Sequence, residues 1–130
     1  MSASELRLVL TVEDFDAALA LFRDALGLPE VEAWEAQGGR IAILGAGRAA
    51  LELVDEAQAE AIDRIEVGRR VAGPVRVAFE VANSAAVAER LVGAGAELVA
   101  GPVETPWRDL NVRLAVPGGI QLTLFSPLGD

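Results

Sequence analysis

The chain carries one strand pattern twice, and this repeat constrains the fold more than any other feature. "RLVLTVED" begins at Arg7, and "RVAFEVAN" begins at Arg76. Apolar side chains recur at every second position in both, which is typical of a β-strand with one face on a core. Each copy ends in a residue that can cap a helix, and an amphipathic helical segment follows from about Asp14 and from about Ser84.

Further strand-like segments follow each helix, so the two halves of the chain have the same element order. In the first half they span about 30–35, 40–44 and 49–54, and in the second half about 97–100, 111–115 and 120–125. We therefore predict an α+β fold of two βαβββ modules within a single domain over 1–130. Module 1 covers about 5–54 and module 2 about 74–127. The connector, about 55–73, predicts a short helix and a loop.

Each module would cover one face of its sheet with its own helix and leave the other face open. Two open faces placed side by side form a groove with the helices outside, and grooves of this kind bind small ligands.

Composition excludes several function classes. The 130 residues include no cysteine and no histidine, which removes disulfides, thiolate catalysis, and the commonest general base and metal ligand. A formal net charge of -9 argues against nucleic acid as a partner. No apolar run is long enough to span a membrane, and the N-terminus lacks the pattern of a secretory signal, so we expect a soluble cytoplasmic protein with no membrane partner.

Three segments together resemble a known superfamily. They are "LTVEDFDAALALFRDALGL" from Leu10, "VAFEVANSAAVAERLVGAGAELV" from Val77 and "VPGGIQLTLF" from Val116. The chain resembles the vicinal oxygen chelate superfamily, which includes glyoxalase I, extradiol dioxygenases and bleomycin-resistance proteins. The resemblance covers nearly the whole chain and implies the glyoxalase/bleomycin resistance fold, a curved, mostly antiparallel sheet with helices outside.

The resemblance also shows where a metal would lie. In metal-dependent members, four side chains on the open sheet face hold a divalent ion, and by position these fall on Arg7, Glu52, Arg76 and Thr123. Arginine stays protonated and has no lone pair to donate, and one carboxylate with one hydroxyl is too few ligands for a dedicated site. We therefore expect no metal and no cofactor.

Period-two alternation selects the side chains that face the groove, and two tryptophans join them. Trp107 lies in a turn among charged residues, and Trp34 lies in a strand, where core or dimer-interface packing is an equal alternative. The charged residues can either contact a ligand or form an ion-pair network with one another. The predicted ligand-binding residues are Arg7, Val9, Thr11, Trp34, Glu52, Arg76, Glu80, Trp107, Arg113 and Thr123.

Two functions remain open. The first is a metal-free binding protein similar to the bleomycin-resistance branch, a homodimer that sequesters a planar aromatic or peptide antibiotic, with no catalytic residue. The alternative is a metal-independent isomerase, cyclase or lyase in which Glu52 or Glu80 is the base. A metal-dependent glyoxalase or dioxygenase is disfavoured by the arginines.

Overall fold

The structure, a computed structural model, describes residues 3–116 and 119–129. All eight strands form one sheet, whose order is β2-β3-β4-β1-β5-β8-β7-β6. The strands are β1 (Glu5–Thr11), β2 (Glu30–Ala36), β3 (Gly39–Ala46), β4 (Ala49–Val54), β5 (Val75–Glu80), β6 (Glu97–Glu104), β7 (Asp109–Ala115) and β8 (Gln121–Pro127). The helical elements are α1 (Phe15–Leu19), the π-helical turn η1 (Ala20–Ala25), α2 (Glu56–Glu66) and α3 (Ser84–Gly93).

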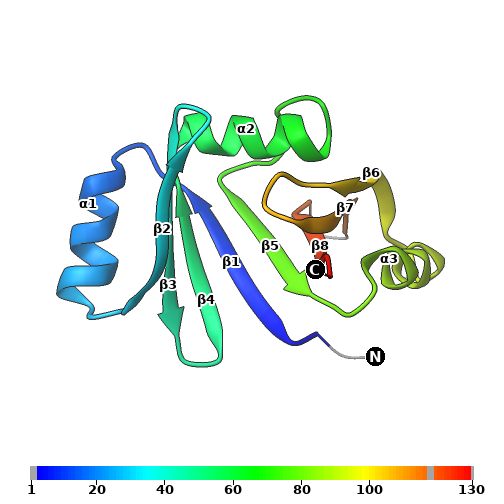
Figure 1. Ribbon diagram of the computed structural model, residues 1–130, viewed down its shortest axis with the longest axis horizontal. Helices are drawn as coiled ribbons and strands as arrows, with labels where there is room; N and C mark the ends of the chain where they lie inside the picture. The colour runs from blue at the N-terminus through cyan, green and yellow to red at the C-terminus, as the bar shows by residue number, and fades with distance from the viewer. Residues whose placement is uncertain (1–2, 117–118, 130) are drawn as a thin grey trace.

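The two halves of the chain meet at the centre of the sheet. Strands β1 and β5 pair antiparallel, with Arg7 opposite Ala78. Within each half the first strand pairs parallel with the last, β1 with β4 and β5 with β8. The sheet curves around an inner face (Figure 1). The predicted α+β class and the curved, mostly antiparallel sheet are therefore confirmed.

Each half has its own core on the outer face of the sheet. Helix α1 and the turn η1 cover one cluster, and α3 covers the other. Both helices start at the last residue of the repeated motif: Asp14 accepts a hydrogen bond from the amide of Ala17, and Asn83 accepts one from the amide of Ala86, each at 3.0 Å. These caps satisfy amides that would otherwise lack partners at the helix start.

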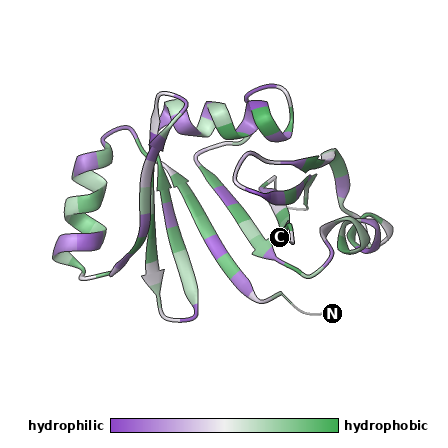
Figure 2. Cartoon of the chain, viewed as in Figure 1, coloured by the Kyte–Doolittle hydropathy of each residue, from purple (hydrophilic) through white to green (hydrophobic). Residues whose placement is uncertain are grey.

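The connector contributes a helix that lies on the inner side of the sheet. Helix α2 spans the two halves (Figure 1), and its Ala59 and Ile62 pack against buried residues of the central strands, including Val9 and Phe125. Hydrophilic bands interrupt the largely hydrophobic central strands β1 and β5 (Figure 2). The inner face thus divides into a part packed on α2 and a part that stays open. None of the described helices is long and apolar enough to cross a membrane.

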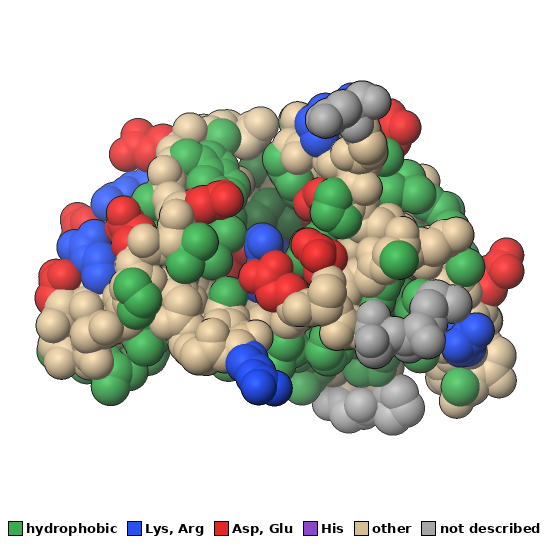
Figure 3. All heavy atoms as spheres, turned by 60° about the horizontal axis from the view of Figure 1, so that its bottom comes forward, with side chains coloured by type: hydrophobic (Ala, Val, Ile, Leu, Met, Phe, Trp, Pro, Cys, Tyr) green, Lys and Arg blue, Asp and Glu red, His purple; other side chains and the backbone are tan. Residues whose placement is uncertain are grey.

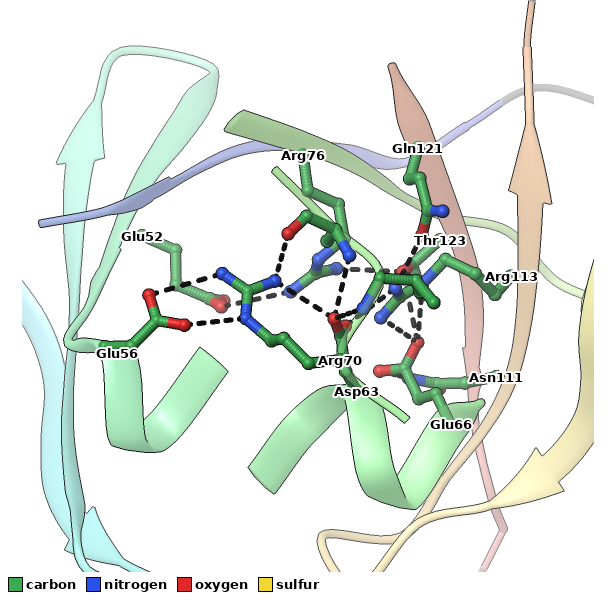
Figure 4. A network of polar contacts seen from close by, with 12 residues as sticks. Glu52, Glu56, Asp63, Glu66, Arg70, Arg76, Asn111, Arg113, Gln121 and Thr123 are labelled. Atoms are coloured by element: carbon green, nitrogen blue, oxygen red, sulfur yellow. Dashed lines mark hydrogen bonds and ion pairs between the residues drawn. The ribbon is translucent and has the colours of Figure 1, made fainter. Parts of the chain in front are cut away.

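Buried ion pairs hold α2 against β7. The Arg113 side chain is fully buried; its Nη1 donates to Asp63 Oδ1 at 2.8 Å, and its Nη2 donates to Glu66 Oε1 at 3.0 Å (Figure 4). The other Asp63 oxygen accepts hydrogen bonds from the amides of Val71 and Ala72, at 2.7 and 2.8 Å. Asp63 therefore ties the helix, the loop that follows it and the sheet into one unit.

We predict that Arg113→Met lowers the free energy of unfolding by about 3–5 kcal/mol, because it leaves the buried carboxylate of Glu66 without a cation and leaves Asp63 with Arg70 alone. Urea unfolding measures this difference. The matched control is Arg64→Met, since Arg64 is exposed on α2 and, among the described residues, pairs with Glu60 alone. The control should cost less than about 1 kcal/mol. Equal losses for the two variants would contradict the prediction.

Candidate functional site

A cleft of about 280 Å³ opens in the inner face, between α2, the central strands and the turn that carries Trp107. We call it the central cleft. Figure 3 shows this hollow with basic side chains at its bottom and acidic side chains around it. Side chains from both halves of the chain and from α2 line the central cleft, and charged and aromatic groups converge in it, so it is the candidate ligand site.

Most of the predicted site residues line the central cleft, and three do not. Those that line it are Arg7, Trp34, Glu52, Arg76, Glu80, Trp107 and Thr123. Val9 is buried under α2, Thr11 borders two other hollows beside Arg70, and Arg113 is enclosed by Asp63 and Glu66. The structure therefore does not bring Val9, Thr11 and Arg113 to the central cleft with the other predicted residues. Strand alternation gives the correct face, but it does not reveal that α2 covers that part of it.

One polar network runs along the bottom of the central cleft. Arg7 Nη1 lies 3.5 Å from Glu52 Oε1, and Arg76 Nη2 lies 3.9 Å from Glu52 Oε2. Arg76 Nη1 also donates to Thr123 Oγ1 at 2.8 Å. Thr123 Oγ1 in turn donates to Glu66 Oε1 at 3.1 Å (Figure 4), which joins this network to the ion pairs beneath α2.

Glu80 stands apart from these pairs. Its carboxylate accepts a hydrogen bond from Ser4 Oγ at 2.7 Å, and among the described residues it has no arginine partner. Of the charged residues predicted either to contact a ligand or to pair with one another, Arg7, Arg76 and Glu52 form ion pairs. Glu80 lines the central cleft outside these pairs.

The four positions at which the resemblance implies metal ligands do not fit a metal ion. Two of them, Arg7 and Arg76, are guanidinium groups, and both face the carboxylate of Glu52. The fourth, Thr123, already accepts from Arg76 and donates to Glu66. Over 3–116 and 119–129, no group of three or more acidic, histidine or cysteine side chains is arranged to hold a metal.

Burial perturbs two carboxyl groups of the central cleft. It raises the pKa of Glu52, against the opposing effect of the Arg76 and Arg7 charges. Burial also raises the pKa of Asp109; the charge of Arg7 opposes this rise, and the neighbouring Glu80 adds to it. Charged carboxylates in both places are therefore less stable than in water, and a cationic partner would stabilise them.

Several lining residues escaped the sequence-based prediction. They are Glu32 on β2, Gln58 and Glu66 on α2, and Asp109 and Asn111 on β7. A signal for Glu66 was present, because Asp63 and Glu66 fall on the same helical stripe as Ala59 and Ile62. Carboxylates on an otherwise apolar stripe indicate a buried cation opposite them. Asn111 shares its strand face with Arg113, so the alternation that selected the arginine also applied to the asparagine.

A family comparison and a structural comparison agree on the architecture. The model of the glyoxalase/bleomycin resistance protein/dioxygenase superfamily matches residues 6–124. No curated protein matches the chain at a significant level.

Solved structures of similar fold come from several bacteria. A hypothetical protein from Bacillus halodurans superposes with a TM-score of 0.67 at 16% identity, covering 99% of this chain and 96% of that chain. Methylmalonyl-CoA epimerase from Mycobacterium tuberculosis gives a TM-score of 0.64 at 21% identity, covering 98% and 88%. A variant of the Streptomyces coelicolor epimerase, in complex with 2-nitronate-propionyl-CoA, gives 0.65 at 19% identity, covering 98% and 97%.

Identities this low show a shared fold and leave the chemistry open. The family model spans nearly the whole chain, from the first strand to the last, and includes both halves of the central cleft. The chain belongs to the glyoxalase/bleomycin resistance protein/dioxygenase superfamily.

Proposed function

We propose that this protein binds a small organic molecule in the central cleft without metal or cofactor, and acts by sequestering that molecule unchanged. The observation that carries the proposal is how the polar groups at the bottom of the cleft are used. Arg7, Glu52, Arg76 and Thr123 bond to one another and to Glu66, so they form a fixed surface. Relatives of the bleomycin-resistance type work by such sequestration, and an antibiotic is the ligand class we propose.

The aromatic side chains of the central cleft suit a planar ligand. Trp34 and Trp107 line it and remain 38% and 37% exposed, a state in which large apolar rings gain by covering another flat surface. Phe125 adds a third ring, over which the Arg7 guanidinium lies at 4.9 Å from the centroid. A planar aromatic or peptide antibiotic would therefore find stacking surfaces near the opening and polar contacts further in.

A CoA ester fits the central cleft less well. The epimerases of similar fold are named for methylmalonyl-CoA, and the phosphates of CoA are strongly anionic. Here Glu32, Glu80 and Asp109 line the cleft without an ion pair among the described residues. Like charges repel, so the electrostatics favour a neutral or cationic ligand.

We predict that Trp107→Ala weakens ligand binding about 10-fold, the scale expected when a stacking ring and its buried area are lost. A panel of planar and peptide antibiotics is first screened by intrinsic tryptophan fluorescence, and the affinity for the best ligand is then measured by calorimetry. Leu98→Ala is the control, because Leu98 is 52% exposed and lies outside the central cleft. The ligand recovered from the same sample should have its original mass. Unchanged affinity in Trp107→Ala would overturn the assignment of this ring.

A second candidate function rests on the environment of Glu52. Burial raises the pKa of this carboxyl beside two arginines in a cleft, which is how enzymes prepare a general base or acid. A metal-independent isomerase, cyclase or lyase would use Glu52 as the base; Glu80 is a less enclosed alternative.

This enzyme hypothesis predicts that the mass or stereochemistry of the bound ligand changes and that Glu52→Gln abolishes turnover. Glu60→Gln, at an exposed position on α2, should keep full activity. Because the base must be deprotonated, the rate should rise with pH through a midpoint above the pKa of an exposed glutamate. Recovery of every bound ligand unchanged, including its stereochemistry, would refute the enzyme and leave sequestration.

We also propose a homodimer. Leu21 on η1, Leu26 just after it and Val31 on β2 are 60%, 64% and 62% exposed, and a second copy would remove these apolar side chains from water. Light scattering should give twice the mass of one chain, and Leu26→Glu should shift the mass toward one chain. The control is Leu98→Glu, since Leu98 lies on β6 at the opposite edge of the sheet. A wild-type protein with the mass of one chain would contradict the dimer.

A further inference from the structure

Two residues that line the central cleft each carry a buried side-chain oxygen that has no hydrogen-bond partner among the described residues. Gln58 and Asn111 are 2% and 4% exposed, and both line the cleft, one from α2 and one from β7. Gln58 Oε1 and Asn111 Oδ1 have no hydrogen-bond partner within the part of the chain that the structure describes. Buried acceptors are nearly always satisfied in folded proteins, so a pair of unsatisfied acceptors in one cleft needs an explanation.

The orientation of the Asn111 amide is fixed by its other contact. Its Nδ2 donates to Glu66 Oε2 at 3.0 Å, so a rotated amide would place an oxygen against a carboxylate oxygen. Asn111 Oδ1 is therefore the atom left for a ligand. The group that binds there must bring a hydrogen-bond donor.

The charges of the central cleft indicate which kind of hydrogen-bond donor a ligand would bring. The arginines at the bottom of the cleft and beneath α2 already have carboxylate partners. Arg7 and Arg76 pair with Glu52, and Arg7 also pairs with Glu5. Arg70 and Arg113 pair with Asp63, Glu56 and Glu66. Glu32, Glu80 and Asp109 remain without a cation among the described residues, and all of them line the cleft. A positively charged donor would form hydrogen bonds with Gln58 Oε1 and Asn111 Oδ1 and would also offset the negative charge of these carboxylates.

We infer that the central cleft is a receptor for an aromatic amine, whose protonated nitrogen is held by Gln58 Oε1 and Asn111 Oδ1 and whose ring stacks on Trp34 or Trp107. A protonated amine has three N–H donors and no acceptor, which matches a cleft with two free acceptors and surplus negative charge. The tryptophan rings favour the same ligand, because aromatic faces attract a nearby cation as well as a flat ring. One orphan donor, Arg7 Nε, remains for an oxygen atom on the same ligand.

This inference rests on the proposed binding function and narrows it to a chemical class. The test compares three probes of one shape, 1-naphthylmethylamine, 1-naphthalenemethanol and 1-naphthoate, by calorimetry on the full chain. The amine should bind about 10-fold tighter than the alcohol, because one charge-assisted hydrogen bond is worth about that difference in affinity. The carboxylate should bind weakest of the three. Equal binding of amine and alcohol, tighter binding of the carboxylate, or no binding of the amine up to its solubility would overturn the inference.

Gln58→Leu tests the orphan oxygen directly. This change removes a buried acceptor that has no partner, so the free protein should unfold at the same urea concentration as wild type or higher. The same change should lower the affinity for the amine about 10-fold and lower the affinity for the alcohol by less, because a neutral hydroxyl donates a weaker hydrogen bond than a protonated amine. Gln37→Leu, in the exposed turn between β2 and β3, should alter neither. Unchanged amine affinity in Gln58→Leu would contradict the role of this oxygen.

The outcomes separate this inference from sequestration. A carboxylate probe that binds tightest and is recovered intact would refute the amine receptor and leave sequestration in place. An amine that binds tightest but is recovered with a changed mass would support the receptor and refute sequestration.

Discussion

The fully buried guanidinium of Arg113 is the group on which the arrangement of the inner face depends. A charge without water around it is stable only when carboxylates and hydrogen bonds surround it. Asp63 and Glu66 supply those carboxylates from α2, at 2.8 and 3.0 Å. The connector helix must therefore lie across the sheet, close enough to bring both carboxylates to β7. Its apolar residues Ala59 and Ile62 then cover one part of the inner face and leave the central cleft beside it.

The same interaction fixes the chemistry of the cleft. Glu66 accepts from Arg113 and from Thr123, and Thr123 accepts from Arg76, whose other nitrogen faces Glu52. Contacts thus run from α2 through β8 and β5 to β4, across both halves of the sheet (Figure 4). Positive charges that would repel a metal ion are balanced by the protein's own carboxylates. A ligand in the central cleft would meet a floor of paired charges, acidic side chains at its edge and aromatic rings.

The sequence predicted the fold well because each strand carries its own alternation and each outer helix its own cap. Asp14 and Asn83 begin helices by local contacts, and such contacts can be read without knowing the rest of the structure. The position of α2 could not be read this way. Its amphipathic pattern shows that one side is buried, but the partner strand is some fifty residues away in the chain. Arg113 was therefore assigned to the correct face of the sheet and to the wrong environment.

The residues of the candidate site fall into two groups, those that strand periodicity predicts and those that it does not. Arg7, Glu52 and Arg76 follow from the strand repeat and line the cleft. Gln58 and Glu66 belong to a segment whose placement depends on tertiary ion pairs, and strand periodicity says nothing of them. Asp109 lies just before the predicted start of its strand, and the ends of elements are the least certain part of such a prediction.

The central claim is that paired arginines and carboxylates stand where metal-dependent relatives bind a divalent ion. Titration of the metal-stripped protein with Mn²⁺ and Zn²⁺, followed by calorimetry, tests it most directly. We expect no saturable binding at one ion per chain. Stoichiometric binding of either ion that disappears in Glu52→Gln would contradict it, because Glu52 would then be a metal ligand and not the counterion of Arg7 and Arg76.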